Sequence, residues 1–312
     1  MPSNQTPLGA LPARFRRERV LIVGCGDVGL RLVERLRGRV HLLALTSSPA
    51  RRAELRAQGL TPLLGNLDDA ASLRRLAGLA TRVVHLAPPP SEGHQDPRTL
   101  ALIHALRRRK QPATLVYGST SGVYGNCADD WVSETRAIHP ETARAQRRVD
   151  AETLLRHWGR GLAVRISILR IPGIYAADRD GGTPRTRLLK GLAVLRSEDD
   201  VYTNHIHADD LARAALLALW RAAAQRTYNV NDDSQLKMGD YFDMAADLYA
   251  LPRPPRITRE VAAETMPAMQ LSFMRESRRM RNTRMKKELG LRLLHPTVMS
   301  GLRVYSRIPD GT

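Results

Sequence analysis

Three glycines near the N-terminus have the spacing of a phosphate-binding turn. Gly24, Gly26 and Gly29 follow a short apolar run and directly precede an amphipathic stretch. In such a unit the first glycine permits a tight turn, the second admits a pyrophosphate at backbone distance, and the third lets the helix pack against the strand. Backbone N–H groups at the helix start then face the phosphates. The sequence therefore predicts a dinucleotide site that also includes Asp27 and Val28; the alternative is a turn with incidental glycines.

The second predicted strand lacks the acidic residue that usually selects NAD. That carboxylate ordinarily follows the glycines by about 20 residues and binds the adenosine 2′-hydroxyl, but no Asp or Glu occurs between Glu34 and Glu54. Thr46, Ser47 and Arg51 stand there instead. Since Arg presents a planar fork of donors that suits a 2′-phosphate, we expect NADP as the cofactor. NAD is the alternative, in which the arginine belongs to a solvated helix turn.

The sequence offers no complete set of metal ligands. Cys25 and Cys127 are too few for a disulfide framework or a four-thiolate site, and they suit a reducing compartment. His205 and His207 have only the two aspartates that follow them as further ligands nearby. We therefore expect no metal in the site.

Short apolar runs alternate with amphipathic stretches from residue 19 onward. Runs of this kind, separated by helical spacings, are typical of a parallel sheet that is covered by helices on both faces. The predicted strands are 20–23, 40–45, 61–64, 83–87, 114–117, 162–169 and 226–230. We predict an α/β fold, namely a Rossmann-type doubly wound parallel sheet with a small C-terminal substrate-binding cap.

The composition changes along the chain and predicts three parts. The first 18 residues contain prolines and arginines without periodic apolar positions, and 176–200 is rich in Gly, Asp and Arg without a clear strand. We expect a flexible basic arm over 1–18, an NAD(P)-binding domain over 19–170 plus 205–230, and a substrate-binding cap over 171–204 plus 231–312.

The net charge of +18 does not by itself indicate a nucleic-acid partner. Arginines make up 44 of the 49 basic residues and are spread at helical spacings, and only 4% of the residues are aromatic. A nucleic-acid surface needs clustered cations, and a single-strand binder needs aromatic platforms. We therefore expect a small molecule, and not a nucleic acid, as the partner.

The sequence also predicts the cellular compartment and the oligomeric state of the protein. No apolar run approaches the roughly 18 residues of a membrane helix, and the start of the chain lacks a secretory signal. We expect a cytoplasmic protein with no membrane partner. The stretches 100–108 and 141–157 are amphipathic enough to pair between subunits, which predicts a homodimer.

Several later segments, in order, resemble an extended short-chain dehydrogenase/reductase of the NAD-dependent epimerase/dehydratase type. The resemblance covers about residues 19–305 and implies that type of fold and cofactor. The segments are Gly-Asn-Leu-Asp at 65–68, Val-His-Leu-Ala at 84–87, Ser-Thr-Ser-Gly-Val-Tyr-Gly at 119–125, Leu-Arg-Ile-Pro-Gly-Ile-Tyr at 169–175, Asn-His-Ile-His-Ala-Asp-Asp-Leu at 204–211, Tyr-Asn-Val-Asn at 228–231 and Asn-Thr-Arg-Met-Lys-Lys-Glu-Leu-Gly at 282–290.

The resemblance implies roles for individual residues beyond the glycines. Asn66 and Leu67 would lie near the adenine, where an amide can bind the amino group although the family commonly has an acid. Ala87 and Pro88 would line the side of the nicotinamide ribose. Thr120 falls at the position of the catalytic Ser or Thr, where its hydroxyl would orient a substrate carbonyl or alcohol. The alternative for Thr120 is a capping or turn hydroxyl.

The chain departs from the family at the catalytic pair. Family enzymes carry Tyr-x-x-x-Lys after the catalytic hydroxyl, and counting back from Glu152 places Arg144 at the Tyr position and Arg148 at the Lys position. A guanidinium stays charged at any working pH, so neither arginine can exchange a proton as the phenol does. Arg148 would still hold the nicotinamide ribose. This departure and the tight glycine spacing are similar to the atypical, YeeZ-like group.

Three functions follow from these patterns. The favoured one is an NAD(P)-binding oxidoreductase or epimerase/dehydratase-like enzyme that acts on a small or nucleotide-linked hydroxyl or carbonyl substrate. The missing catalytic pair supports a second, a non-catalytic NAD(P)-sensing regulatory protein. The net charge supports a third, a basic nucleic-acid-associated protein.

Overall fold

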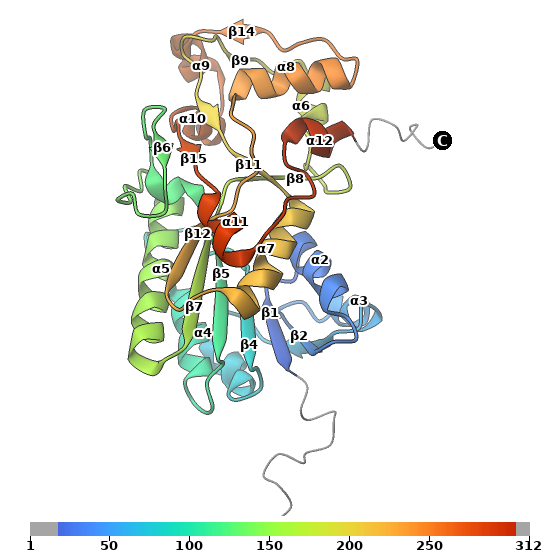
Figure 1. Ribbon diagram of the computed structural model, residues 1–312, viewed down its shortest axis with the longest axis vertical. Helices are drawn as coiled ribbons and strands as arrows, with labels where there is room; N and C mark the ends of the chain where they lie inside the picture. The colour runs from blue at the N-terminus through green and yellow to red at the C-terminus, as the bar shows by residue number, and fades with distance from the viewer. Residues whose placement is uncertain (1–17, 304–312) are drawn as a thin grey trace, which may run out of the picture.

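Seven parallel strands form the central sheet (Figure 1). The computed structural model describes residues 18–303, apart from the side chains of Ala268 and Met269, so the predicted arm lies outside the described residues except for Glu18. In spatial order the strands are β12 (Arg226–Asn229), β7 (Arg165–Ile171), β5 (Thr114–Thr120), β4 (Arg82–His85), β1 (Arg19–Val23), β2 (His41–Thr46) and β3 (Thr61–Leu64).

The strand order reverses at β1, as in a doubly wound sheet. From β1 the chain continues to β2 and β3 on one side, and then returns to β4, β5, β7 and β12 on the other. Because all strands are parallel, their carboxyl ends lie at one edge, which faces the upper part of the molecule in Figure 1. In such sheets ligands bind in the crevice at the carboxyl ends, beside the switch point.

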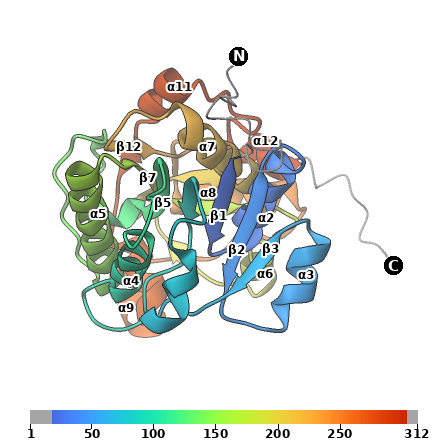
Figure 2. The same cartoon turned by 90° about the horizontal axis from the view of Figure 1, so that it is seen from below.

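Helices cover both faces of this sheet (Figure 2). The first face carries α2 (Asp27–Leu36), α3 (Arg51–Ala57) and α7 (Ala208–Arg221), and the second carries η1 (Ala70–Leu76), α4 (Pro97–Leu106) and α5 (Ala143–Leu162). Within β1, Ile22 packs into the core on the first face, whereas Leu21 and Val23 pack into the core on the second. The strand is apolar throughout because both of its faces are buried. The predicted Rossmann-type fold is confirmed.

Two strand predictions differ from the structure. The run 162–169 predicts a strand from Leu162, but Leu162 is the last residue of α5, and Ala163 takes a left-handed backbone with φ of 55° that ends the helix before β7. Residues 176–200 contain the short strand β9 (Val194–Leu195), which pairs in parallel with β14 (Arg256–Ile257). A two-residue strand is too short to leave a periodic signal in a sequence.

A smaller unit, the cap, lies over the carboxyl edge of the sheet (Figure 1). Val194, Phe242 and Val298 belong to a separate apolar core there. Its elements include β8 (Gly173–Tyr175), α6 (Arg185–Leu189), β9, β10 (Tyr202–Thr203), β11 (His205–His207), β13 (Leu236–Lys237), α8 (Met238–Leu248), β14, α9 (Arg259–Thr265), α10 (Ala268–Met274) and α12 (Val298–Arg303). The connections over the sheet edge also contain η2 (Ser121–Tyr124), β6 (Trp131–Val132) and β15 (Arg279–Met280).

One late helix packs with the sheet and not with the cap. α11 (Thr283–Leu289) lies between the cap elements α10 and α12 in sequence, but Met285 and Leu289 belong to the same core as α2 and α7. The C-terminal region therefore contributes to both units. None of the helices within residues 18–303 combines the length and the apolar character needed to cross a bilayer.

Candidate active site

The glycine turn lies between β1 and α2, at the carboxyl edge of the sheet. Gly24 has a φ of 88°, and a Cβ there would lie 2.3 Å from the backbone nitrogen of Ala87, so only glycine fits where the chain leaves β4. A Cβ on Gly29 would lie 3.2 Å from the Gly24 carbonyl oxygen, whereas one on Gly26 would meet no atom within 4 Å. Gly26 thus leaves open space beside the backbone, as a pyrophosphate requires.

A cavity of about 340 Å³ opens at this turn, and we call it the cofactor cavity. Gly24, Gly26, Asp27, Val28 and Gly29 all line it. The carboxyl ends of neighbouring strands, and segments that follow, complete its wall with Leu86, Gly118, Ser119, Thr120, Arg148, Ile171, Pro172, Ile174, Arg179 and Leu211. The structure therefore brings the predicted turn residues together around a space that could hold a phosphate, with the N-terminus of α2 directed toward it.

Arg51 lies beside the glycine turn, although it is distant in sequence. Its Nη2 donates a hydrogen bond to the Cys25 carbonyl oxygen at 3.0 Å, and its guanidinium pairs with the Glu54 carboxylate at 3.1 Å. The predicted Thr46 hydroxyl is engaged in a local turn, because it accepts from the backbone N–H of Ser48 at 3.2 Å. Arg51 is therefore close to the turn and already engaged by Glu54, and its role toward a 2′-phosphate stays a prediction.

The other residues predicted for the adenosine end lie on exposed loops. Ser47 is exposed at the end of β2. Asn66 follows β3, and its side-chain oxygen accepts from the backbone N–H of Asp68 at 3.1 Å. Leu67 is half-buried beside it. None of these three side chains lines the cofactor cavity, so a role at the adenine stays a prediction.

A second cavity of about 620 Å³ lies between the sheet edge and the cap, and we call it the substrate cavity. Pro88 lines it, while Ala87 is buried behind it against the glycine turn. Thr120, Arg148 and Pro172 line both cavities. A ligand in the substrate cavity would therefore contact a ligand in the cofactor cavity beside these three residues.

Thr120 and Arg148 are both held in place at this junction. The Thr120 hydroxyl accepts a hydrogen bond from the Gly122 backbone N–H at 3.3 Å, so it caps η2 while facing the two cavities. Arg148 Nη1 donates to the Gly118 carbonyl oxygen at 2.8 Å and to the Tyr117 hydroxyl at 3.1 Å. The guanidinium is thus fixed as a positive charge at the point where the cavities meet.

The junction has no obvious substitute for the missing phenol. Tyr117 touches Arg148, but it is fully buried, and burial raises its pKa to about 12. Arg144, at the expected Tyr position, lines the substrate cavity and lies 4.6 Å from the centre of the Phe273 ring. A guanidinium cannot act as a base. Neither side chain can exchange a proton with a substrate near neutral pH.

Three further side chains that could in principle donate a proton, His85, Tyr124 and His205, are held by their packing. His85 is buried and shares a hydrogen bond of 3.0 Å with Thr99, and burial lowers its pKa to about 3. The Tyr124 hydroxyl donates to Asn229 at 2.7 Å in the interior. His205 lines the substrate cavity beside the ring of Tyr241, and burial lowers its pKa to about 4. His205 is therefore neutral and only weakly basic at physiological pH.

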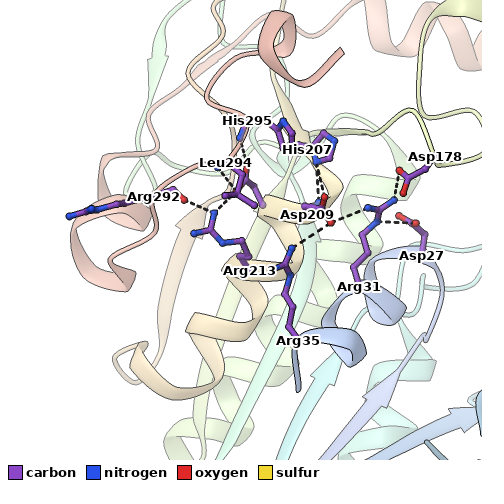
Figure 3. Close-up of polar contacts among 11 residues, drawn as sticks. Asp27, Arg31, Arg35, Asp178, His207, Asp209, Arg213, Arg292, Leu294 and His295 are labelled. Atoms are coloured by element: carbon purple, nitrogen blue, oxygen red, sulfur yellow. Dashed lines mark hydrogen bonds and ion pairs between the residues drawn. The ribbon is translucent and has the colours of Figure 1, made fainter. Parts of the chain in front are cut away.

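An ion-pair cluster links the glycine helix to the cap (Figure 3). Arg31 on α2 donates to Asp27 at 3.1 Å, to Asp178 at 2.6 Å and to Asp209 at 3.0 Å. Asp178 lies in the segment that follows β8, and its neighbour Arg179 pairs with Asp27 at 3.2 Å. This cluster holds Arg179 in the wall of the cofactor cavity, a position that no sequence motif indicates.

The same cluster brings two histidines together. His207 stacks on His295, with ring centres 3.7 Å apart and planes inclined by 33°, and its Nδ1 lies 3.7 Å from an Asp209 oxygen. Three potential metal ligands therefore meet here, and one of them, His295, is not among those that the sequence shows. However, His207 Nδ1 already accepts a hydrogen bond from the Asp209 backbone N–H at 3.2 Å, and Arg31 already pairs with the Asp209 carboxylate. In this arrangement the contact between the two histidines joins the segment after α11 to the start of α7.

Two comparisons of the sequence find proteins that are similar to this chain. The model of the NAD dependent epimerase/dehydratase family matches residues 20–231. A GDP-6-deoxy-D-mannose reductase from Pseudomonas aeruginosa is 27% identical over 255 residues, which cover 74% of this chain and 80% of the reductase.

Solved structures share the fold over almost the whole chain. A conserved protein of unknown function from Silicibacter pomeroyi is 29% identical, with a TM-score of 0.77 over 92% of this chain and 97% of the other. A UDP-glucose 4-epimerase from Thermotoga maritima, solved with UDP-glucose, is 18% identical with a TM-score of 0.75 over 92% and 97%. A dTDP-glucose 4,6-dehydratase from Streptomyces venezuelae, solved with NAD, is 20% identical with a TM-score of 0.71 over 93% and 96%.

Proposed function

Because this chain belongs to the NAD-dependent epimerase/dehydratase family, we propose that it is an NAD(P)-dependent oxidoreductase or epimerase that acts on a nucleotide-linked sugar. The observation that carries this proposal is the junction of the two cavities at Thr120, Arg148 and Pro172. A substrate carbon held there would lie against the nicotinamide end of a dinucleotide bound at the glycine turn. The relative from Pseudomonas aeruginosa, whose name contains a GDP-linked sugar, supports the same substrate class.

The glycine turn and its neighbours would hold the cofactor. The backbone at Gly26 and the start of α2 would bind the pyrophosphate, with Arg179 as a nearby positive charge. Arg51, beside the turn, would bind the 2′-phosphate of NADP after releasing Glu54. The bound nicotinamide supplies or accepts a hydride.

Thr120 and Arg148 would act on the reacting oxygen of the substrate. The Thr120 hydroxyl can donate a hydrogen bond to that oxygen, and the fixed charge of Arg148 can stabilise negative charge that develops on it. Neither group can remove a proton near neutral pH. The reaction in this site is therefore expected to be slow with simple alcohols. It is expected to depend on substrates that carry a group able to take up or release the proton.

The proposal is tested by supplying purified protein with NADP or NAD and a panel of UDP-, GDP- and dTDP-linked sugars. We expect absorbance of reduced cofactor, or sugar interconversion seen by NMR, with at least one nucleotide sugar, and we expect Thr120→Val to abolish it. Tight nucleotide-sugar binding with no turnover under any condition would contradict an enzymatic function.

A second candidate function is an NAD(P) sensor without catalysis. It is favoured by Arg144 and Arg148, which stand where the family has its proton-transferring pair. A sensor would bind the dinucleotide tightly, turn over none of the panel, and change its affinity for a protein partner when the cofactor is oxidised or reduced.

A further inference from the structure

One part of the molecule, opposite the two cavities, carries positive charge only. It is the edge of the central sheet at which β4, β5 and β7 begin, at the lower end of the molecule in Figure 1. The elements that reach this edge lie in stretches of sequence without any Asp or Glu, namely 70–91, 97–128 and 153–177. The Glu18 carboxylate comes near, but it is already paired with Arg82 at 3.2 Å. Cations at this edge therefore lack a local counter-charge.

Six exposed cations lie on this part of the edge, and we call them the amino-edge patch. They are Arg75 in η1, Arg107, Arg108, Arg109 and Lys110 after α4, and Arg160 in the last turn of α5. Within the described residues, no ion pair or hydrogen bond engages any of these six side chains. Single exposed cations without a carboxylate partner also occur elsewhere, for example Arg52 and Lys287. The amino edge differs because six of them share one surface.

The connections that carry these cations touch one another, so the patch is continuous. A Cβ on Gly78, in the connection before β4, would lie 3.2 Å from the Cβ of Arg109 in the connection before β5. On the other side of the patch, Trp158 Nε1 near the end of α5 donates to Gln111 Oε1 at 2.9 Å. The sequence does not show this clustering, because residues 75, 107–110 and 160 are far apart in the chain.

Like charges gathered on one surface favour a polyanion as the partner. The connections 77–81, 107–113 and 163–164 contain no Phe, Tyr or Trp on which the bases of a single-stranded nucleic acid could stack. η1, α4 and α5 reach the edge with their C-terminal ends, so none of them is placed to enter the groove of a duplex.

Two exposed leucines adjoin the cations. Leu79 is 36% exposed and follows Gly78, which lies against Arg109, and Leu162 is 41% exposed at the end of α5. Cations that flank exposed apolar side chains suit the surface of an anionic bilayer, because the cations pair with headgroup phosphates while the apolar groups enter the boundary of the acyl chains. A nucleic acid offers no such apolar layer to the leucines.

We propose that the amino-edge patch docks on an anionic phospholipid surface. In this orientation the two cavities, at the carboxyl edge of the sheet, face away from the bilayer and stay open to solutes (Figure 1). Such a contact needs no spanning helix, so it is separate from the expectation of no membrane partner, which was based on the length of the apolar runs. The inference is also independent of the proposed function, because it uses no residue of either cavity.

The experiment measures sedimentation of the full-length protein with vesicles. One set contains equal parts of phosphatidylglycerol and phosphatidylcholine, and the other contains phosphatidylcholine alone. We expect binding to the anionic vesicles only, and weaker binding as the salt concentration rises. The edge variant, Arg107→Gln/Arg108→Gln/Arg109→Gln, should lose roughly a hundredfold in affinity, because each cation near an anionic surface contributes roughly fivefold.

Two further variants separate the patch from the net charge of the protein. Arg52→Gln/Lys190→Gln/Lys287→Gln removes three exposed cations outside the amino edge, and it should lose far less affinity than the edge variant. Replacing the three edge arginines by lysine keeps the charge and should keep the binding. Equal losses in the edge variant and the distant variant, or a lysine variant as weak as the edge variant, would overturn the proposal.

The leucines distinguish a bilayer from a nucleic acid. We expect Leu79→Ser/Leu162→Ser to bind anionic vesicles more weakly than the wild type and to bind a duplex DNA fragment equally well. The proposal is wrong if the wild type binds the duplex but not the vesicles, or if the serine variant binds both as the wild type does. Saturating NADP with UDP-glucose should leave vesicle binding unchanged, and displacement of the vesicles would place the contact at the cavities instead.

A stability measurement excludes a structural role for the edge arginines. Because their side chains have no partner within residues 18–303, we expect the edge variant to unfold at the same denaturant concentration as the wild type. A markedly lower free energy of unfolding would show that these cations stabilise the C-terminal end of α4, and would contradict the proposal.

Discussion

The open space beside Gly26 makes this residue a direct test of the cofactor cavity. A branched side chain there would project into the space that a pyrophosphate requires, while meeting no protein atom. We expect Gly26→Val to fold normally and to lose measurable dinucleotide binding in calorimetric titration. Gly161→Val is the matched control, because a Cβ there also meets no atom but lies at the end of α5. Equal dinucleotide binding by both variants would contradict the site.

The role that we propose for Arg51 predicts a preference between the two cofactors, because its guanidinium lies beside the turn. We expect tighter binding of NADP than of NAD, by roughly ten- to hundredfold, from one charge-assisted contact of about 1.5–3 kcal/mol. Arg51→Ala should remove this difference, and Arg52→Ala, an exposed neighbour, should keep it. Glu54→Gln should increase the preference for NADP, because it removes the carboxylate that now pairs with Arg51. Equal affinities in the wild type would show that Arg51 does not reach the cofactor.

Arg144 and Arg148 lead us to expect very slow oxidation of simple secondary alcohols. General acid–base assistance commonly contributes about 10²–10⁴ in rate, and neither guanidinium can provide it. We expect the double variant Arg144→Tyr/Arg148→Lys to reduce bound cofactor faster than the wild type with the same alcohols. Fast turnover by the wild type that disappears in His205→Gln would identify that imidazole as the proton carrier, and would refute the expectation.

At the scale of elements, a buried ion pair joins α5 to the sheet. Glu152 on α5 accepts hydrogen bonds from Ser119 at the end of β5 at 2.7 Å and from Arg170 on β7 at 2.8 Å. Glu152 follows Arg148 by about one turn of α5. The ion pair therefore also fixes the part of α5 that reaches the junction of the cavities. Removing one partner leaves the other charge buried without compensation.

We therefore expect Glu152→Ala to lower the free energy of unfolding by about 3–5 kcal/mol, measured by denaturant titration. Asp247→Ala is the matched control, because its pair with Arg253 at 2.7 Å is exposed on the cap and screened by water. The control should change stability little. Similar losses in the two variants would show that burial does not determine the contribution of the Glu152 pair.

At the scale of the whole molecule, three buried histidines couple folding to pH. Burial lowers the pKa of His85 to about 3 and the pKa values of His205 and His207 to about 4. In the unfolded chain an imidazole titrates near about 6.5. Below that pH the unfolded state therefore binds more protons than the folded state, so acid favours unfolding. Asp232 acts in the opposite direction, because burial raises its pKa to about 7.

We expect the free energy of unfolding to fall as the pH decreases from about 6.5 toward about 4, since three imidazoles outweigh one carboxyl group. The measurement is denaturant unfolding at a series of pH values. His85→Gln should reduce the slope of the unfolding free energy against pH by the equivalent of about one proton. His104→Gln, which alters an exposed histidine, is the control. A free energy that stays constant over this range would contradict the burial of these rings.

Much of the fold was predictable from the sequence because its signals are local. The apolar runs of the central sheet, the glycine spacing and the helical periodicity each depend on residues within one element, and buried parallel strands are apolar on both faces. The end of α5 was not predictable, because Ala163 gives no sign of its left-handed backbone. The cap strands are too short for a periodic signal. The predicted homodimer and the roles of Asn66 and Leu67 stay predictions.

For the candidate site, the turn residues Gly24, Gly26 and Gly29 were predictable from their spacing, and so was the replacement of the catalytic pair by Arg144 and Arg148. The tertiary structure was needed to show how residues distant in the chain meet. It placed His295 against His207 and Arg179 against Asp27, and it brought the connections of the amino-edge patch together. Such contacts depend on how the helices and connections pack over the sheet edge. A sequence pattern records the spacing within an element, and it does not record which carboxylate lies beside which arginine across the fold.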